Sequence, residues 1–206
     1  MSIIPALKWR YSLKHFSNKS VSDQHIDNLV EAARFSASSY GLQPYTLLVI
    51  SDRDLLQQLS KEAFDQAQVR ECSHLLVFLP LQTLSEQNID QHFDRVYEQS
   101  QTPKGSLNGY ADHIKRALLN KTADELKAWA EQQAYIALGS VLAEAASLGI
   151  DTCPMTGFDP VAFNRTLQLE GSNQGACVIC AVGYRQDSDI PPIKVRIPKE
   201  HFSAYL

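Results

Sequence analysis

The sequence predicts an α+β fold in which a small sheet is covered by many helices. Helix and strand signals alternate along the chain, the strand signals are short apolar runs, and one apolar stripe is long enough for a central helix. A chain of 206 residues is long enough to bury about 70% of its unfolded surface. We therefore expect a single domain over residues 1–206.

The first quarter of the chain predicts two helices and a strand. Residues Pro5 to Tyr11 suit a short helix. Ser22 is a favourable N-cap, with Asp23 in the first turn, for a helix that continues to about Phe35. The run Tyr-Thr-Leu-Leu-Val-Ile at 45–50 has the composition of a strand.

The next segments predict a helix, a buried strand and a polar excursion. Asp52 or Asp54 begins a helix toward Phe64. The unbroken apolar run at 74–79, closed by Pro80, indicates a strand buried on both faces. Residues 85–120 are polar and helical, are interrupted by proline and glycine, and contain few core residues. We expect this segment to form a lid or excursion over a site.

A long central helix is predicted after residue 122. Thr122 and Glu125 have the spacing of a capping box, and the pattern continues to about Leu148, where Gly149 ends it. Such a helix is roughly 40 Å long at 1.5 Å per residue. An apolar stripe and small residues around Gly139 indicate a core helix that can also pack in a dimer.

The C-terminal part predicts two strands, a helix and an arm. A brief strand is expected at 150–154, a helix capped by Asp159 and Pro160 to about Leu169, and a strand at 175–184. Pro191, Pro192 and Pro198 then hold the chain extended. We expect residues 190–206 to form an arm that contains no helix.

Composition and charge exclude several classes of partner. The net charge is −4 at pH 7 and no segment carries a stripe of Lys and Arg, which argues against nucleic acid. The least polar stretch, at 134–150, is too short and too polar to span a bilayer. The first residues lack the charged and apolar regions of a signal peptide. We expect a cytoplasmic protein with no membrane partner.

The cysteines and histidines give no clear catalytic or metal site. Cys177 and Cys180 form a C-x-x-C that could be redox-active or half a zinc site, but their apolar surroundings favour buried strand cysteines. Cys72 and Cys153 are interpreted as core residues. His92 and His113 lack neighbours at ligand spacing and are expected on solvated helix faces. We expect no metal and no side chain that acts as a catalytic nucleophile.

Two short basic clusters lie at opposite ends of this acidic chain. Arg10, Ser12 and Lys14 are near the start, and Lys194 and Arg196 are near the end. Arg, Lys and a hydroxyl together form charge-assisted bonds to phosphate oxygens. The sequence contains neither a G-x-G-x-x-G motif nor a P-loop. If the clusters converge, we expect them to bind a phosphate-bearing cofactor, although each cation alone is as well explained as surface charge.

A set of ordered landmarks resembles the nitroreductase family of FMN-dependent NAD(P)H oxidoreductases, in particular its oxygen-insensitive, dihydropteridine-reductase-like branch. The resemblance runs nearly end to end, and its strength lies in the order and spacing of the landmarks. They are Arg10-x-Ser12-x-Lys14-x-Phe16, Ser36-Ala-Ser38-Ser39-x-x-x-Gln43-Pro44, Ser73-His-Leu-Leu-Val-Phe78, Pro154-Met-Thr-Gly-Phe158, Gly183-Tyr-Arg185 and Lys194-x-Arg196-x-Pro198.

The resemblance implies a fold and an assembly. Members are α+β proteins with a small, mainly antiparallel sheet, a long central helix and an extended C-terminal arm. They are homodimers with two FMN sites, each built from both subunits. In this chain the resemblance implies FMN contacts from five places: the first basic cluster, two serines of the partner, the 65–68 region, the 154–157 turn and the arm. The residues are Arg10, Tyr11, Ser12, Lys14, Ser38, Ser39, Asp65, Gln68, Pro154, Met155, Thr156, Gly157, Lys194 and Arg196.

The resemblance also implies individual roles. Arg10, Ser12, Lys194 and Arg196 would hold the phosphate and ribityl chain. Lys14 would approach flavin N1 and O2 and stabilise the reduced anion, and the backbone N–H at Thr156 would face N5. Tyr40 and residues 85–120 are candidates to shape the acceptor pocket, or are ordinary helix surface.

The chain departs from the family pattern at four positions. Asp65 and Gln68 stand where Asn and Lys are usual, Thr156 replaces a common Glu, and Gly41 replaces another Asn. Because Asp65 and Gln68 make the pocket less positive, we expect a lower two-electron flavin potential than in typical relatives.

The predicted function is ping-pong hydride transfer from NADH or NADPH, through flavin N5, to nitroaromatic, quinone or similar electrophilic acceptors. Three alternatives stay open: a reductase of enones, pterins or halogenated rings, a non-catalytic FMN-binding protein, and a flavinless interaction protein. The sequence does not decide between the two nicotinamides.

Overall fold

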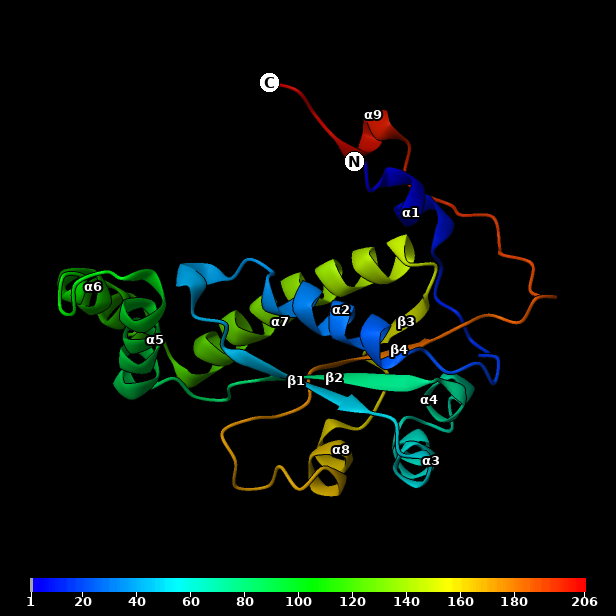
Figure 1. Ribbon diagram of the computed structural model, residues 1–206, viewed down its shortest axis with the longest axis horizontal. Helices are drawn as coiled ribbons and strands as arrows, with labels where there is room; N and C mark the ends of the chain where they lie inside the picture. Colours follow the sequence, from blue (N-terminus) through cyan, green and yellow to red (C-terminus); the bar gives the residue numbers. More distant parts are fainter. Residues whose placement is uncertain (1) are drawn as a thin grey trace.

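A four-stranded antiparallel sheet forms the centre of the computed structural model, which describes residues 2–206 (Figure 1). Its strands are β1 (Tyr45–Ile50), β2 (His74–Pro80), β3 (Asp151–Met155) and β4 (Val178–Gly183), in the order β1-β2-β4-β3. Tyr45 lies opposite Pro80, and Asp151 lies opposite Gly183. All three strand pairs are antiparallel, which confirms the predicted sheet.

One face of the sheet is covered by α2 (Asp23–Arg34) and α7 (Ala123–Ser147), which cross it side by side (Figure 1). The predicted caps are present: Ser22 accepts a hydrogen bond from the His25 backbone N–H, and Thr122 and Glu125 form a capping box. The inward side chains of both helices join those of β2 and β4 in one apolar cluster. The predicted central helix is therefore confirmed, within a residue or two at each end.

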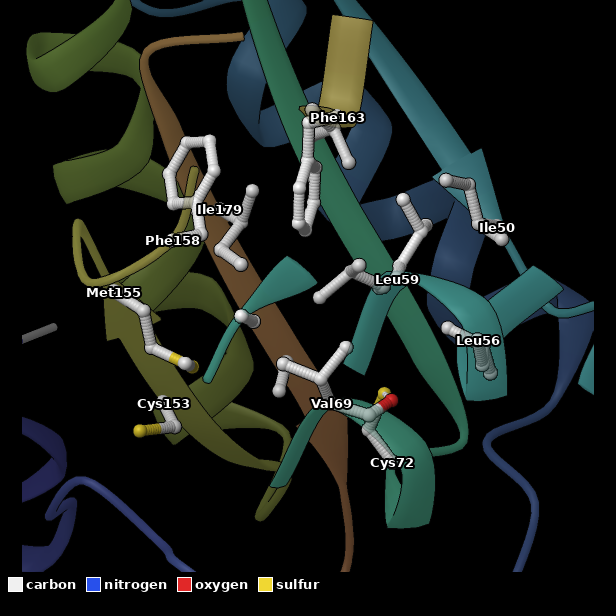
Figure 2. Packing of buried hydrophobic residues seen from close by; sticks show 14 of the residues in the cluster. Ile50, Leu56, Leu59, Val69, Cys72, Cys153, Met155, Phe158, Phe163 and Ile179 are labelled. Carbon is white, nitrogen blue, oxygen red and sulfur yellow. Dashed lines mark hydrogen bonds between the residues drawn. The ribbon is translucent and has the colours of Figure 1, made fainter. Parts of the chain in front are cut away.

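The opposite face is covered by α3 (Arg53–Glu62), α4 (Ala67–Glu71) and α8 (Pro160–Thr166) (Figure 1). Figure 2 shows Phe158 and Phe163 above Ile179 of β4, and the two phenyl rings are 4.6 Å apart between centroids. Cys153 and Met155 extend from β3 into the same cluster. Because both faces are covered, β2 is buried along nearly its whole length, as its apolar run predicts.

The 85–120 segment forms a helical hairpin with a small core of its own. Its helices are α5 (Glu86–Ser100) and α6 (Asn108–Leu119), and they lie together at one end of the molecule (Figure 1). Ile89, Phe93 and Ile114 are almost fully buried and pack with Leu42 and Leu126. The expectation that this segment contributes little to a core is wrong, because its apolar residues repeat at helical spacing within a polar sequence.

The arm returns to the first helix near α7, since Lys194 contacts the Leu7 carbonyl. The first helix, α1 (Ile4–Trp9), packs on α7. After β4 the chain runs as an extended arm, with Ile190 90% and Ile193 93% exposed. The prediction that this arm contains no helix is wrong over α9 (Lys199–Phe202), since Pro198 has the backbone geometry that starts a helical turn.

Several other boundaries differ from the sequence predictions. The first helix ends at Trp9 because Arg10 is extended and Ser12 bridges to Thr152 beside β3. The helix expected to reach Leu169 ends at Thr166, β4 begins only at Val178, and α4 was not predicted. Cys177 therefore precedes the strand and is only half-buried, and His92 is half-buried against Phe93. No helix among residues 2–206 is both long and apolar enough to cross a bilayer.

Candidate functional site

The two basic clusters meet at the junction of α1 and the arm. The Lys194 ammonium donates to the Leu7 carbonyl at 2.7 Å and to the Arg10 carbonyl. Burial, and then the neighbouring charges of Arg10 and Arg196, lower the pKa of Lys194. Cations from both ends of the chain are thus brought into one electrostatic neighbourhood.

This junction has the polar groups that a phosphate requires. The Arg10 side chain donates to Ser12 Oγ at 3.3 Å, while its Nε is buried without a hydrogen-bond partner. Within residues 2–206, no carboxylate forms an ion pair with Arg10, Lys194 or Arg196. A buried N–H that lacks an acceptor, among unpaired cations, fits an anion such as the phosphate of FMN.

Lys14 lies beside the strand that leads to the predicted flavin turn. The Leu13 N–H donates to the Thr152 carbonyl at 3.2 Å and Ser12 forms a bridge with Thr152, so this segment follows the outer edge of β3. The Lys14 ammonium is 3.6 Å from Cys153 Sγ. Burial raises the pKa of the Cys153 thiol more than Lys14 lowers it, so the thiol is neutral and the lysine charge stays uncompensated.

The predicted flavin turn, Pro154 to Gly157, is fixed by a glutamine that sequence reasoning missed. Gln66 donates to the Gly157 carbonyl at 2.6 Å and to the Ala63 carbonyl at 3.0 Å, and it accepts from Gln68 at 3.0 Å. Met155 is buried, while Thr156 and Gly157 are exposed. The tip of the turn is therefore open to a ligand.

Gln68 and Asp65 differ in their surroundings. Gln68 is 4% exposed and its amide is engaged by Gln66. Asp65 is exposed in the turn between α3 and α4, in the left-handed backbone region at φ 55°. Asp65 thus adds negative charge next to the loop that contacts Gly157, and the Asn usual in the family would suit the same backbone.

Ser38, Ser39 and Tyr40 form a segment that contacts α7 near its middle and the α5–α6 hairpin. The Ser39 N–H donates to the buried side chain of Gln133 at 2.8 Å. Tyr40, in the short 3₁₀ helix η1 (Ser39–Gly41), has a strained φ of 58°, and its ring meets the edge of Tyr110 at 6.5 Å. Strain of this kind is concentrated at functional segments.

One chain therefore does not bring all the predicted residues together. Lys194 contacts Arg10 where the chain reaches the edge of β3, just after the C-terminal end of α7, whereas Ser39 contacts Gln133 near the middle of α7. Gln133 precedes the last residue of α7, Ser147, by 14 residues, which corresponds to about 21 Å along the helix. We call these two separate groups of predicted FMN-binding residues half-sites.

The cysteines are not activated. Burial raises the pKa of Cys72 and of Cys177 to about 12, and it also raises the pKa of Cys180. These thiols are protonated at neutral pH, which disfavours a redox role for the C-x-x-C pair. Among residues 2–206, no three His, Cys, Asp or Glu side chains are arranged to hold a metal ion.

The sequence and the fold also match known proteins. A family model described as the nitroreductase family matches residues 7–184. The chain belongs to the nitroreductase family. This is a family of oxidoreductases, so the chain is an enzyme of that class.

Relatives and solved structures agree with this assignment. A Staphylococcus saprophyticus protein, provisionally named NAD(P)H nitroreductase, is 30% identical over 215 residues, which cover 100% of this chain and 97% of that protein. A Bacillus subtilis structure described as a nitroreductase has a TM-score of 0.88 at 20% identity, with 98% of both chains covered. An Exiguobacterium sibiricum structure in complex with FMN has a TM-score of 0.86 at 21% identity and covers 100% of this chain and 98% of that one.

Proposed function

We propose that the protein is an FMN-dependent NAD(P)H oxidoreductase that reduces electrophilic acceptors such as nitroaromatics and quinones. The buried, unpaired Nε of Arg10, among cations from both ends of the chain, is the observation that carries this proposal. The provisional names of the relatives supply the electron donor, and the FMN complex of a fold neighbour supports the cofactor.

Each part of the half-site around α1 has a task toward FMN. Arg10, Ser12, Lys194 and Arg196 hold the phosphate and ribityl chain, with Tyr11 beside them. Lys14 supplies a positive charge for the reduced flavin, and the exposed turn at Thr156 presents backbone to the ring. When bound, FMN would supply the chemistry of ping-pong hydride transfer between NAD(P)H and the acceptor. The chain itself then has to bind, orient and tune the cofactor.

The half-site is completed by a second copy of the chain. Tyr135 and Ile136 are 44% and 48% exposed on α7, and Gly139 is exposed one turn further along the helix. Many apolar side chains of the arm are also open to solvent. A homodimer would bury these surfaces and bring Ser38 and Ser39 of one copy to the FMN held by the other.

The same assembly gives the hairpin a role. Tyr40 follows the two serines and contacts Tyr110 of α6, so residues 85–120 of one copy would border the acceptor pocket at the flavin held by the other copy. Residues 190–206 would serve as the arm that extends over the partner.

Anaerobic addition of NADH or NADPH to the FMN-loaded protein tests the proposal. Bleaching of the flavin absorbance, followed by recovery on addition of a nitroaromatic or quinone, is the expected result. Recovery only with enones, pterins or halogenated rings would move the assignment to another acceptor class. Persistent colour would identify a binding protein, and a preparation that takes up no FMN would overturn the proposal.

A further inference from the structure

Arg185 lies where three segments of the chain meet. It is the second residue after β4, in the segment that leads into the arm. Its side chain donates to the Asp151 carboxylate from Nε at 3.0 and 3.1 Å and from Nη2 at 2.5 Å. Its backbone N–H donates to the same carboxylate at 2.9 Å. Asp151, at the start of β3, is 2% exposed, so the carboxylate of this ion pair is buried and both of its oxygens accept hydrogen bonds.

The same guanidinium also contacts the N-terminal cluster through two aromatic rings. Its central carbon is 4.3 Å from the Trp9 ring centroid and 4.7 Å from the Tyr11 ring centroid. Arg stacks well on aromatic faces because it is planar and weakly hydrated. Trp9 and Tyr11 flank Arg10 in the sequence. The Arg185 side chain therefore contacts both neighbours of Arg10, whose buried Nε has no hydrogen-bond acceptor.

We propose that Arg185 is a positioning residue for the phosphate end of the cofactor. It does not form part of the cation cluster. Through Trp9 and Tyr11 it fixes the extended backbone of Arg10, and Lys194 of the arm donates to the Arg10 carbonyl. Asp151 connects Arg185, and through it Trp9 and Tyr11, to the sheet, so the cations from both ends of the chain are held next to β3. This inference rests on the proposed function.

Arg185→Lys is the informative variant. Lysine keeps the positive charge beside Asp151, but it lacks the planar fork that bonds the carboxylate and stacks on two rings at once. Arg34→Lys is the matched control. Arg34 also binds a carboxylate bidentately, that of Glu31 at 2.6 Å, and lies 4.1 Å from an aromatic centroid, that of Phe35. It belongs to α2 and has no contact with the cation cluster.

The readout compares FMN with riboflavin, which lacks the phosphate. In Arg185→Lys we expect the Kd for FMN to increase about tenfold, which corresponds to about 1.4 kcal/mol. The Kd for riboflavin should change much less, because Lys14 and the 154–157 turn are untouched. Arg34→Lys should bind both flavins like the natural protein. The apo-protein's thermal midpoint is measured alongside, to confirm that each variant is folded.

The outcomes are separable. If Arg185→Lys is folded and binds FMN like the natural protein, the positioning role is overturned. Equal weakening of FMN and riboflavin would also overturn it, since a general structural defect does not select for the phosphate. If Arg185→Lys does not fold, Trp9→Leu replaces it; this variant keeps the ion pair, and its unchanged affinity for FMN would refute the inference. Failure of the natural protein to bind FMN would instead refute the proposed function.

Discussion

In the proposed phosphate site, Lys194 is the residue at which cofactor binding and protonation would be most directly coupled. Its pKa lies below the usual 10.5 because it is partly buried beside Arg10 and Arg196. A bound phosphate dianion favours the ammonium form and raises that pKa. Between the two pKa values, FMN binding takes up a proton, so the Kd for FMN should increase as the pH rises through this range. FMN titrations at several pH values between about pH 8 and about pH 10 measure this change in Kd.

Lys194→Arg provides the control for this pH effect. A guanidinium does not titrate in this range, so the variant should lose the part of the pH dependence that comes from Lys194. If the Kd for FMN depends on pH equally in the natural protein and in Lys194→Arg, Lys194 is not the group whose protonation is coupled to FMN binding.

Asp65 is expected to lower the flavin potential. Asp65→Asn removes a negative charge beside the proposed flavin turn, in a backbone conformation that Asn adopts readily. The two-electron midpoint potential should increase by on the order of 30 mV, which corresponds to about 1.4 kcal/mol. Potentiometry against a reference dye measures this change. Asp54→Asn, an exposed change in the first turn of α3, should leave the potential unaltered, and an unaltered value in Asp65→Asn would refute the effect.

Among the elements, β4 makes a close contact with the N-terminal segment. A methyl group at Gly183 would lie 2.6 Å from Cδ1 of Phe16, whose side chain is 4% exposed. Gly183→Ala should therefore destabilise the protein by about 1–3 kcal/mol, as overpacked core sites do. Urea unfolding measures this change. Gly109→Ala is the comparison, since a methyl group there meets no atom within 4 Å; equal stabilities would contradict the steric argument.

The α5–α6 hairpin should act on the acceptor and not on the cofactor. Tyr110 is 49% exposed and contacts Tyr40 and Phe93 through ring edges, while it stacks on His113. An aromatic pair contributes about 0.5–1.5 kcal/mol beyond its buried area, so Tyr110→Ala should raise KM for aromatic acceptors several-fold. FMN content should not change. A loss of bound FMN without a change in KM would contradict this prediction, because it would show that the hairpin supports the cofactor and not the acceptor pocket.

At the scale of the whole molecule, the proposed homodimer would make cofactor binding depend on assembly. Ile136→Glu places a charge on the exposed apolar face of α7 and should convert a dimer to monomers, because a buried unpaired charge is costly. FMN content should fall in parallel, since each proposed site takes residues from two copies. Size-exclusion chromatography and flavin absorbance measure the two quantities. A monomeric variant that retains full FMN content would show that one chain forms the whole site.

The parts of the fold that follow from local chemistry were predictable. The N-caps at Ser22, Thr122 and Asp159 define helix starts, and the apolar run of β2 defines a strand buried on both faces. The α5–α6 core was missed because it depends on the tertiary packing of these two largely polar helices on each other, which the local sequence does not indicate. Gln66, Asp151 and Arg185 were missed as a support for the candidate site, since a glutamine in a turn and one Asp–Arg pair carry no signal until the strands bring them together. The meeting of the two basic clusters was predictable as a charge pattern, but its place beyond α7 was not.

The unpaired Nε of Arg10 makes the cofactor a counter-ion for the fold itself. Arg10, Lys194 and Arg196 repel one another where the arm meets the N-terminal segment, so the proposed binding of a phosphate there would favour the folded state over the unfolded one. FMN at one hundred times its Kd stabilises the folded state by about 2.7 kcal/mol. Flavin supply in the cell would then control how long newly made protein survives proteolysis, so the amount of this enzyme would follow the availability of its cofactor even at a constant rate of synthesis.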